Sequence, residues 1–143
     1  MIELSRPTYD HIVAHARDGG ALEVCGLLAG VRGGDGEPSV ATEAYAAENV
    51  AETPQTRYAM DAEEQLELIE RAEAAGLDVV GFYHSHPAGP THPSQTDAER
   101  ATWPGHSYVI CALDGAPFVG SWRWRGADGF EQETVAVRGD REE

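Results

Sequence analysis

A run of β-branched and aromatic residues leads directly into two histidines near the middle of the chain. The run covers residues 77–83 and predicts a buried strand that continues into His84-Ser85-His86. Because alternate residues of a strand face the same side, His84 and His86 are expected to project together while Ser85 faces away. The segment therefore predicts a buried strand with two metal-binding side chains on one face.

A short helix is predicted after a loop, with Ser94 as its N-cap and Asp97 in its first turn. The loop that precedes it contains three prolines, Pro87, Pro90 and Pro93. Prolines restrict the loop and lower the entropy that is lost when it closes around an ion. Two imidazoles and the Asp97 carboxylate would leave one tetrahedral position for water, which is the arrangement of catalytic zinc.

The cysteines exclude the other common kind of zinc site. Structural zinc is usually closed by four protein ligands, mostly cysteines, and this chain has only Cys25 and Cys111. Both lie in apolar segments, so we expect them to be small buried side chains and not a disulfide.

Each half of the candidate site is weak by itself. A His-x-His pair occurs by chance on surface strands, and Ser-x-x-Asp is also an ordinary capping box. The combination of both, with a strand before and a helix after, favours a metal site. His11 and His15 are four residues apart on a predicted helix, but they lack the glutamate of the His-Glu-x-x-His signature and are not expected to bind metal.

A single carboxylate, Glu23, stands near the start of the apolar run 21–30. One interpretation is that Glu23 is solvated at the exposed entrance of a strand. The other is that it lies beside the metal and acts as general base and then general acid. The segment alone leaves both open.

Together these residues resemble the signature of the JAMM (MPN+) metalloproteases, in which a glutamate is followed by a distant His-x-His, seven residues, a serine, two residues and an aspartate. The matching positions are Glu23-Val24-Cys25-Gly26-Leu27, His84-Ser85-His86-Pro87, Ser94 and Asp97. The resemblance extends from about Pro7 to Trp124. It includes residues 49–61, which are similar to the same stretch of prokaryotic stand-alone members of the desampylase type.

The resemblance implies a role for each position. His84, His86 and Asp97 would bind one zinc ion, Glu23 would activate the water, and Ser94 would help to stabilise the oxyanion. It also implies a single domain with a mixed curved sheet flanked by helices, like that of the cytidine deaminases.

The implied activity is that of a zinc-dependent isopeptidase or peptidase. It would cleave after the C-terminal Gly-Gly of ubiquitin-like modifiers, such as small archaeal modifier conjugates, by attack of a zinc-activated water. One alternative is the release of cysteine or a small amine from a sulfur-carrier protein. A non-catalytic scaffold of the MPN type is the other, but all five signature positions are filled.

Size and hydropathy favour one cytoplasmic domain. The chain has 143 residues and 41% hydrophobic residues, which is the usual size and composition of a single domain. No apolar run approaches the roughly 18 residues of a membrane span, and no basic-then-apolar signal pattern begins the sequence. We expect the domain to cover residues 1–137 and residues 138–143 to form a disordered tail.

The net charge limits the partners. The ten basic residues are all arginine, and 25 acidic residues give a formal charge of -15. Nucleic acid is excluded as a partner, because its phosphates would be repelled. Such an acidic, lysine-free composition favours a source that lives in high salt. A GC-rich genome would explain arginine in place of lysine, but not the excess of acid.

Periodicity and turn signals predict an α+β fold. A first helix is expected from Pro7 to Gly19, followed by a hairpin of strands at 22–31 and 39–47. Asp61 is expected to cap a second helix that packs through Leu66, Ile69 and Leu77. After the histidine strand and the short helix, three strands are predicted near 107–113, 117–125 and 129–137.

Overall fold

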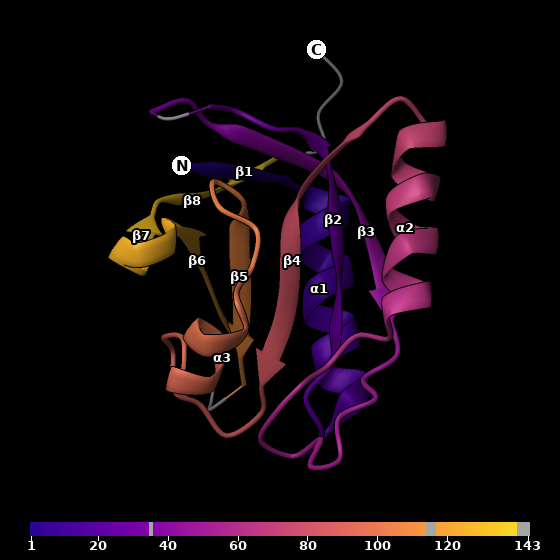
Figure 1. Cartoon of the computed structure of the whole chain (residues 1–143), viewed down its shortest axis with the longest axis vertical. Helices are drawn as coiled ribbons and strands as arrows, with labels where there is room; N and C mark the ends of the chain where they lie inside the picture. The colour runs from indigo at the N-terminus through magenta and orange to yellow at the C-terminus, as the bar shows by residue number, and fades with distance from the viewer. Residues whose placement is uncertain (35, 114–116, 140–143) are drawn as a thin grey trace.

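The computed structural model describes residues 1–34, 36–113 and 117–139 (Figure 1). The strands are β1 (Ile2–Ser5), β2 (Cys25–Val31), β3 (Ser39–Ala47), β4 (Asp78–His86), β5 (Ser107–Ala112), β6 (Phe118–Trp124), β7 (Phe130–Glu133) and β8 (Val135–Arg138). The helices are α1 (Arg6–Gly19), α2 (Ala62–Ala74), α3 (Gln95–Arg100) and a single 3-10 turn, η1 (Gly126–Asp128). The predicted α+β class is confirmed.

One mixed sheet of eight strands, in the order β7-β6-β5-β4-β2-β3-β1-β8, forms the frame. Strands β7 and β8 are consecutive in the chain but lie at opposite ends of this order. In a flat sheet those two edges would be about 34 Å apart, at about 4.8 Å between neighbouring strands. Only Thr134 separates the two strands, so the sheet must curl until its edges approach.

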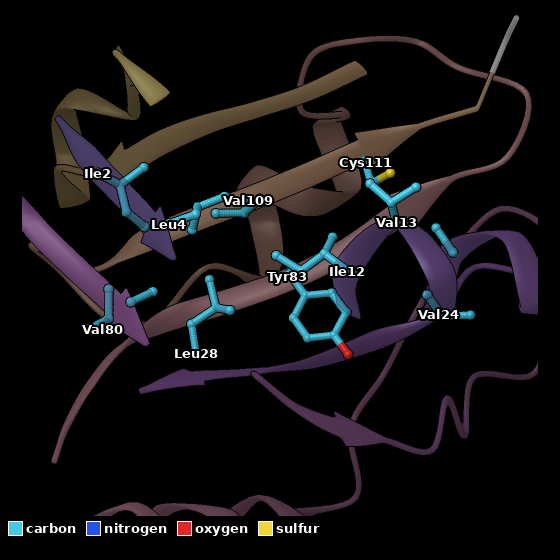
Figure 2. Close-up of a cluster of buried hydrophobic side chains, with 12 residues drawn as sticks. Ile2, Leu4, Ile12, Val13, Val24, Leu28, Val80, Tyr83, Val109 and Cys111 are labelled. Atoms are coloured by element: carbon cyan, nitrogen blue, oxygen red, sulfur yellow. The ribbon is translucent and has the colours of Figure 1, made fainter. Parts of the chain in front are cut away.

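Helix α1 packs on one face of this curled sheet. The Ser5 side chain caps the helix by accepting a hydrogen bond from the Thr8 amide at 3.2 Å. Ile12, Val13 and Ala16 form the buried stripe of the helix, and Figure 2 shows the first two facing side chains of the sheet. The predicted first helix is confirmed, with the apolar face that the sequence indicated.

Helix α2 covers the opposite face and corrects one prediction. Asp61 is its N-cap, as expected, and accepts from two amides of the first turn. Leu66 is wrong as a packing residue, because 54% of it is exposed, whereas Leu68 and Ala72 are buried. Residues 66 and 68 are about 200° apart around a helix, so they cannot share one face. Ile69 and Leu77 do pack against the core on this side.

Several shorter elements differ from the prediction. Strand β1 was not expected, and the last predicted strand is in fact two strands, β7 and β8, on different edges of the sheet. Four-residue strands carry too little periodicity to be recognised. The tail expected at 138–143 falls mostly outside the described residues, and Arg138 is the last residue of β8. Cys25 and Cys111 are both free and buried, as predicted.

A bulge in β4 decides which face carries the histidines. Leu28 of β2 pairs with Gly81 and Ala29 pairs with Val79, so Val80 is an extra residue. Val80 packs on the α1 side, whereas Phe82 packs on the α2 side. With two-residue periodicity, the next residues on the Phe82 face are the two histidines. The pair therefore faces away from α1.

None of the helices formed by the described residues is both long and apolar enough to cross a membrane.

Candidate metal centre

Three ligand atoms meet at the end of β4. The Nε2 atoms of His84 and His86 are 3.2 Å apart, and Asp97 Oδ2 is 3.2 Å from the first and 3.1 Å from the second. In a tetrahedral zinc site with bonds of about 2.0–2.1 Å, the ligand atoms are about 3.3–3.4 Å apart. The triangle therefore fits one face of such a tetrahedron.

The third member of this triangle is held by the start of α3. Ser94 Oγ accepts from the Asp97 amide at 3.0 Å, and Asp97 Oδ2 accepts from the Ser94 amide at 2.9 Å. This capping box is the one predicted from the sequence. The same carboxylate oxygen thus closes the cap and faces the two imidazoles.

The hydrogen bonds of His86 show why a cation suits this triangle. His86 Nδ1 is 2.8 Å from the Pro90 carbonyl oxygen, which can only accept, so Nδ1 must donate. A neutral His86 then turns the lone pair of Nε2 toward the Asp97 carboxylate. That contact is repulsive unless a proton or a metal ion lies between the two atoms.

The pKa values apply to the state in which a proton, and not a metal ion, lies between His86 Nε2 and the Asp97 carboxylate. Burial works against the charge on His86, but its hydrogen bonds with Asp97 and Pro90 raise the pKa above the ordinary value. Burial lowers the pKa of His84. Burial also opposes the charge of Asp97, yet its hydrogen bonds with both histidines hold the pKa of this carboxyl well below its usual range. An anionic carboxylate and two imidazoles with converging nitrogens form a donor set suited to zinc.

Glu23 lies beside these residues. It precedes β2, which pairs with β4 so that Cys25 is opposite His84. One carboxylate oxygen of Glu23 and a ring nitrogen from each histidine all lie within 4.8 Å of one another. These three could themselves hold an ion, but the triangle that contains Asp97 is tighter and makes the better ligand set.

The environment of Glu23 overturns the interpretation of a solvated strand entrance. Only 6% of the residue is exposed, and its Oε1 has no hydrogen-bond partner among the described residues. Burial raises the pKa of Glu23 to about 7, although the nearby His86 opposes this shift. A carboxyl group with such a pKa can both take and return a proton near neutral pH.

Two further residues at the site were missed from the sequence. The ring of Tyr58 stacks on the imidazole of His84, with centroids 4.4 Å apart and planes at 24°. The side chain of Asn49 donates to the Glu23 carbonyl oxygen at 2.9 Å. Both belong to the stretch 49–61, which resembled prokaryotic JAMM members but suggested no role for any one residue.

An aromatic pocket adjoins the centre. It has a volume of about 270 Å³ and is lined by Tyr58, Met60, Phe82, Trp103 and Tyr108, among others. Because Tyr58 also stacks on His84, this side chain forms the wall between the pocket and the ligand triangle. The pocket and the triangle thus share the ring of Tyr58.

The histidine pair of α1 has a different environment. His11 and His15 lie 3.2 Å and 2.7 Å from the hydroxyl of Tyr83, which projects from β4 toward α1. Tyr83 and His84 are neighbours on a strand, so the two histidine pairs lie on opposite faces of the sheet.

The pKa of Glu23 predicts a pH-dependent stability once a chelator has removed any metal. With an ordinary value of 4.5 and a folded value of about 7, this carboxyl binds its proton more tightly in the folded state. Its stabilising contribution is complete at low pH and is lost as the pH rises through about 7. The free energy of unfolding of Glu23→Gln, relative to that of wild type, should therefore rise by about 1–2 kcal/mol from about pH 5 to about pH 8, allowing for partial solvation.

Urea unfolding of both chelated proteins at the two pH values measures this gain. A stability difference that stays constant with pH would mean that Glu23 keeps an ordinary pKa.

Comparisons with known proteins identify the family and the fold. The family model described as prokaryotic homologs of the JAB domain matches residues 5–125. A desampylase from Haloferax volcanii is 43% identical over 140 residues, which cover 95% of this chain and 96% of that protein. A CysO-cysteine peptidase from Mycobacterium tuberculosis is 39% identical over 99 residues, which cover 69% of this chain and 64% of that protein. A solution structure of a protein from Desulfitobacterium hafniense, at 32% identity, superposes with a TM-score of 0.87 over 99% of this chain and 96% of that one.

Proposed function

The chain belongs to the prokaryotic JAB-domain family, of the JAMM/MPN type, and from this premise we propose that it is a cytoplasmic, zinc-dependent isopeptidase. Its substrates are ubiquitin-like modifiers that end in Gly-Gly, and it hydrolyses the bond that follows this dipeptide. The 43% identity to a desampylase over nearly the whole of both chains supports this choice of substrate. The observation that carries the proposal is the triangle of His84, His86 and Asp97 with the buried Glu23 beside it.

Each residue of the site has a distinct part in this proposal. His84, His86 and Asp97 would hold the zinc ion, which when bound supplies a Lewis acid that polarises the scissile carbonyl and lowers the pKa of water. The Glu23 carboxylate takes the proton of the attacking water and then gives it to the leaving amine. Its raised pKa of about 7 suits both transfers at neutral pH.

Ser94 would stabilise the oxyanion that develops on the scissile carbonyl. Its Oγ accepts from the Asp97 amide, which leaves the hydroxyl proton free to donate. Replacing Ser94 with alanine should therefore lower kcat about 100-fold while zinc stays bound.

Ser94→Gly separates this role from helix capping. Glycine at an N-cap costs only a few tenths of a kcal/mol, against about 1 kcal/mol for alanine. Similar losses of kcat in both variants, with one zinc per chain in each, would support the oxyanion role. Loss of zinc from Ser94→Ala alone would show that the hydroxyl acts through the cap.

A second substrate class is favoured by a specific finding. The likeness to a CysO-cysteine peptidase covers 69% of this chain and indicates an enzyme that releases cysteine or a small amine from a sulfur-carrier protein. Both substrate classes share a protein with a C-terminal Gly-Gly and differ only in the amine that leaves. The same residues would therefore serve either reaction.

The deciding experiment offers the purified protein three substrates in molar salt, where an acidic surface with a formal charge of -15 is best screened. They are a modifier joined to lysine by an isopeptide bond, a linear modifier fusion and a carrier-cysteine adduct, each assayed with and without chelator. Chelator-sensitive cleavage of the lysine conjugate is expected. Cleavage of the cysteine adduct alone would favour the second substrate class. Bound zinc without cleavage of any of the three substrates would refute the proposed enzymatic activity.

A further inference from the structure

The segment that connects β3 to α2 is organised by one side chain. Asn49 uses its full hydrogen-bonding capacity of two donors and two acceptors. Its Oδ1 accepts from the amides of Ala51 and Ala59, both at 3.0 Å. Its Nδ2 donates to the carbonyl oxygens of Arg57, at 3.0 Å, and Glu23, at 2.9 Å. Three of these bonds close the segment on itself, and the fourth leaves it.

That fourth bond reaches a residue just outside the strand ladder, next to Val24, whose amide donates to Ser85 Oγ of β4 at 2.9 Å. Glu23 lies two residues before the start of β2, so it has no place in the strand ladder. Its carbonyl accepts from Asn49, and its amide donates at 2.7 Å to the carbonyl of Pro54, which belongs to the same segment. The backbone of Glu23 is thus held on both sides by residues 49–60.

The same segment also reaches the ligand triangle. Tyr58, between the two residues that Asn49 binds at 57 and 59, stacks on the ring of His84 at 4.4 Å. The segment has few backbone bonds of its own, among them Val50 N–H to the Ala59 carbonyl at 2.9 Å, and these contacts add to them. If the hydrogen bonds of Asn49 are lost, the backbone of Glu23 and the Tyr58 ring that stacks on His84 are both less constrained.

We propose that Asn49 is a positioning residue, which fixes the backbone of Glu23 so that its carboxylate stays beside the ligand triangle. The proposal rests on the proposed function, in which Glu23 transfers protons. A displacement of a catalytic group by about 1 Å can lower a rate about 100-fold. Loss of the one hydrogen bond from Asn49 to the Glu23 backbone can therefore lower the rate, if the carboxylate moves by that much.

The test uses Asn49→Asp in the full chain. A carboxylate has the shape of the amide and keeps both acceptor bonds to Ala51 and Ala59, but it has no donor for Glu23 or Arg57. Gln132→Glu, at an exposed position of strand β7, makes the same chemical change outside the residues of the candidate site and serves as the control.

With a modifier-lysine conjugate, Asn49→Asp should lower kcat about 30- to 100-fold, leave KM within about twofold and keep one zinc per chain. Amide hydrogen exchange supplies a second result that does not depend on turnover. The amide of Glu23, which donates to the Pro54 carbonyl of this segment, should exchange at least about tenfold faster, while the amides of β4 stay protected as in the control.

Other results would overturn the proposal or identify a different failure. A kcat within about threefold of wild type, or a loss explained by missing zinc, would overturn the positioning role. If Asn49→Asp fails to fold, Asn49→Ala, which adds no charge, takes its place with the same expected results. If the wild type cleaves no conjugate, the proposed function fails, and unchanged exchange at Glu23 would then refute the backbone constraint independently.

Discussion

Replacing Glu23 with glutamine is expected to lower kcat about 1,000-fold or more while one zinc ion stays bound. Glutamine keeps the size of the side chain but cannot take a proton, and general acid-base catalysis contributes about 10²–10⁴-fold. Because Glu23 is proposed to act first as base and then as acid, the loss should lie toward the upper end of that range. Turnover of a modifier-lysine conjugate and metal analysis of the same sample measure the two halves of this result.

Glu43→Gln is the matched control, since Glu43 is an exposed carboxylate on β3 and the substitution removes the same charge. It should leave kcat unchanged. Loss of zinc from Glu23→Gln would place the carboxylate among the ligands, in agreement with its short distances to both histidines. Retained turnover with zinc bound would exclude Glu23 as the proton carrier.

Replacing Asp97 with alanine is expected to remove both zinc and activity. The substitution takes away the anionic member of the ligand triangle and leaves two neutral nitrogens, His84 Nε2 and His86 Nε2. Metal content should fall from one per chain to near zero, and cleavage should fall to the chelated background. His86→Ala should behave in the same way.

Thermal unfolding gives an independent measure of the Asp97 result. Zinc at about 100 times its Kd stabilises a protein that binds it only when folded by about 2.7 kcal/mol, and Asp97→Ala should show no such gain. Glu99→Ala, on the exposed side of α3, controls for the change in the helix and should keep the full gain. A zinc-dependent gain in Asp97→Ala would mean that another set of residues holds the ion.

The arrangement of the proposed ligands was predictable because it depends on local rules. Two-residue periodicity places His84 and His86 on one face, and a capping box places Asp97 in the first turn of a helix. The choice of face was not predictable. It depends on the bulge at Val80, and the apolar residues on both sides of the bulge show no alternation that would mark it.

The surroundings of Glu23 could not be derived from its segment, because they are made by distant parts of the chain. Its place beside the histidines follows from the pairing of β2 with β4, which are about 60 residues apart. Its backbone partners, Asn49 and Pro54, lie in a segment without periodicity. The resemblance to a family suggested the proposed role of Glu23, whereas long-range contacts make its environment.

The capping box of α3 links the folding of this short helix to the binding of the proposed zinc ion. A helix of six residues is far too short to be stable in isolation. The oxygen that closes its cap, Asp97 Oδ2, is also the one that faces the histidines. With Asp97 as the proposed ligand, winding of the helix and binding of the ion are linked equilibria, and each favours the other. In a cell, the free zinc concentration would then set not only how many molecules can react but also how well formed is the surface that they present to a substrate.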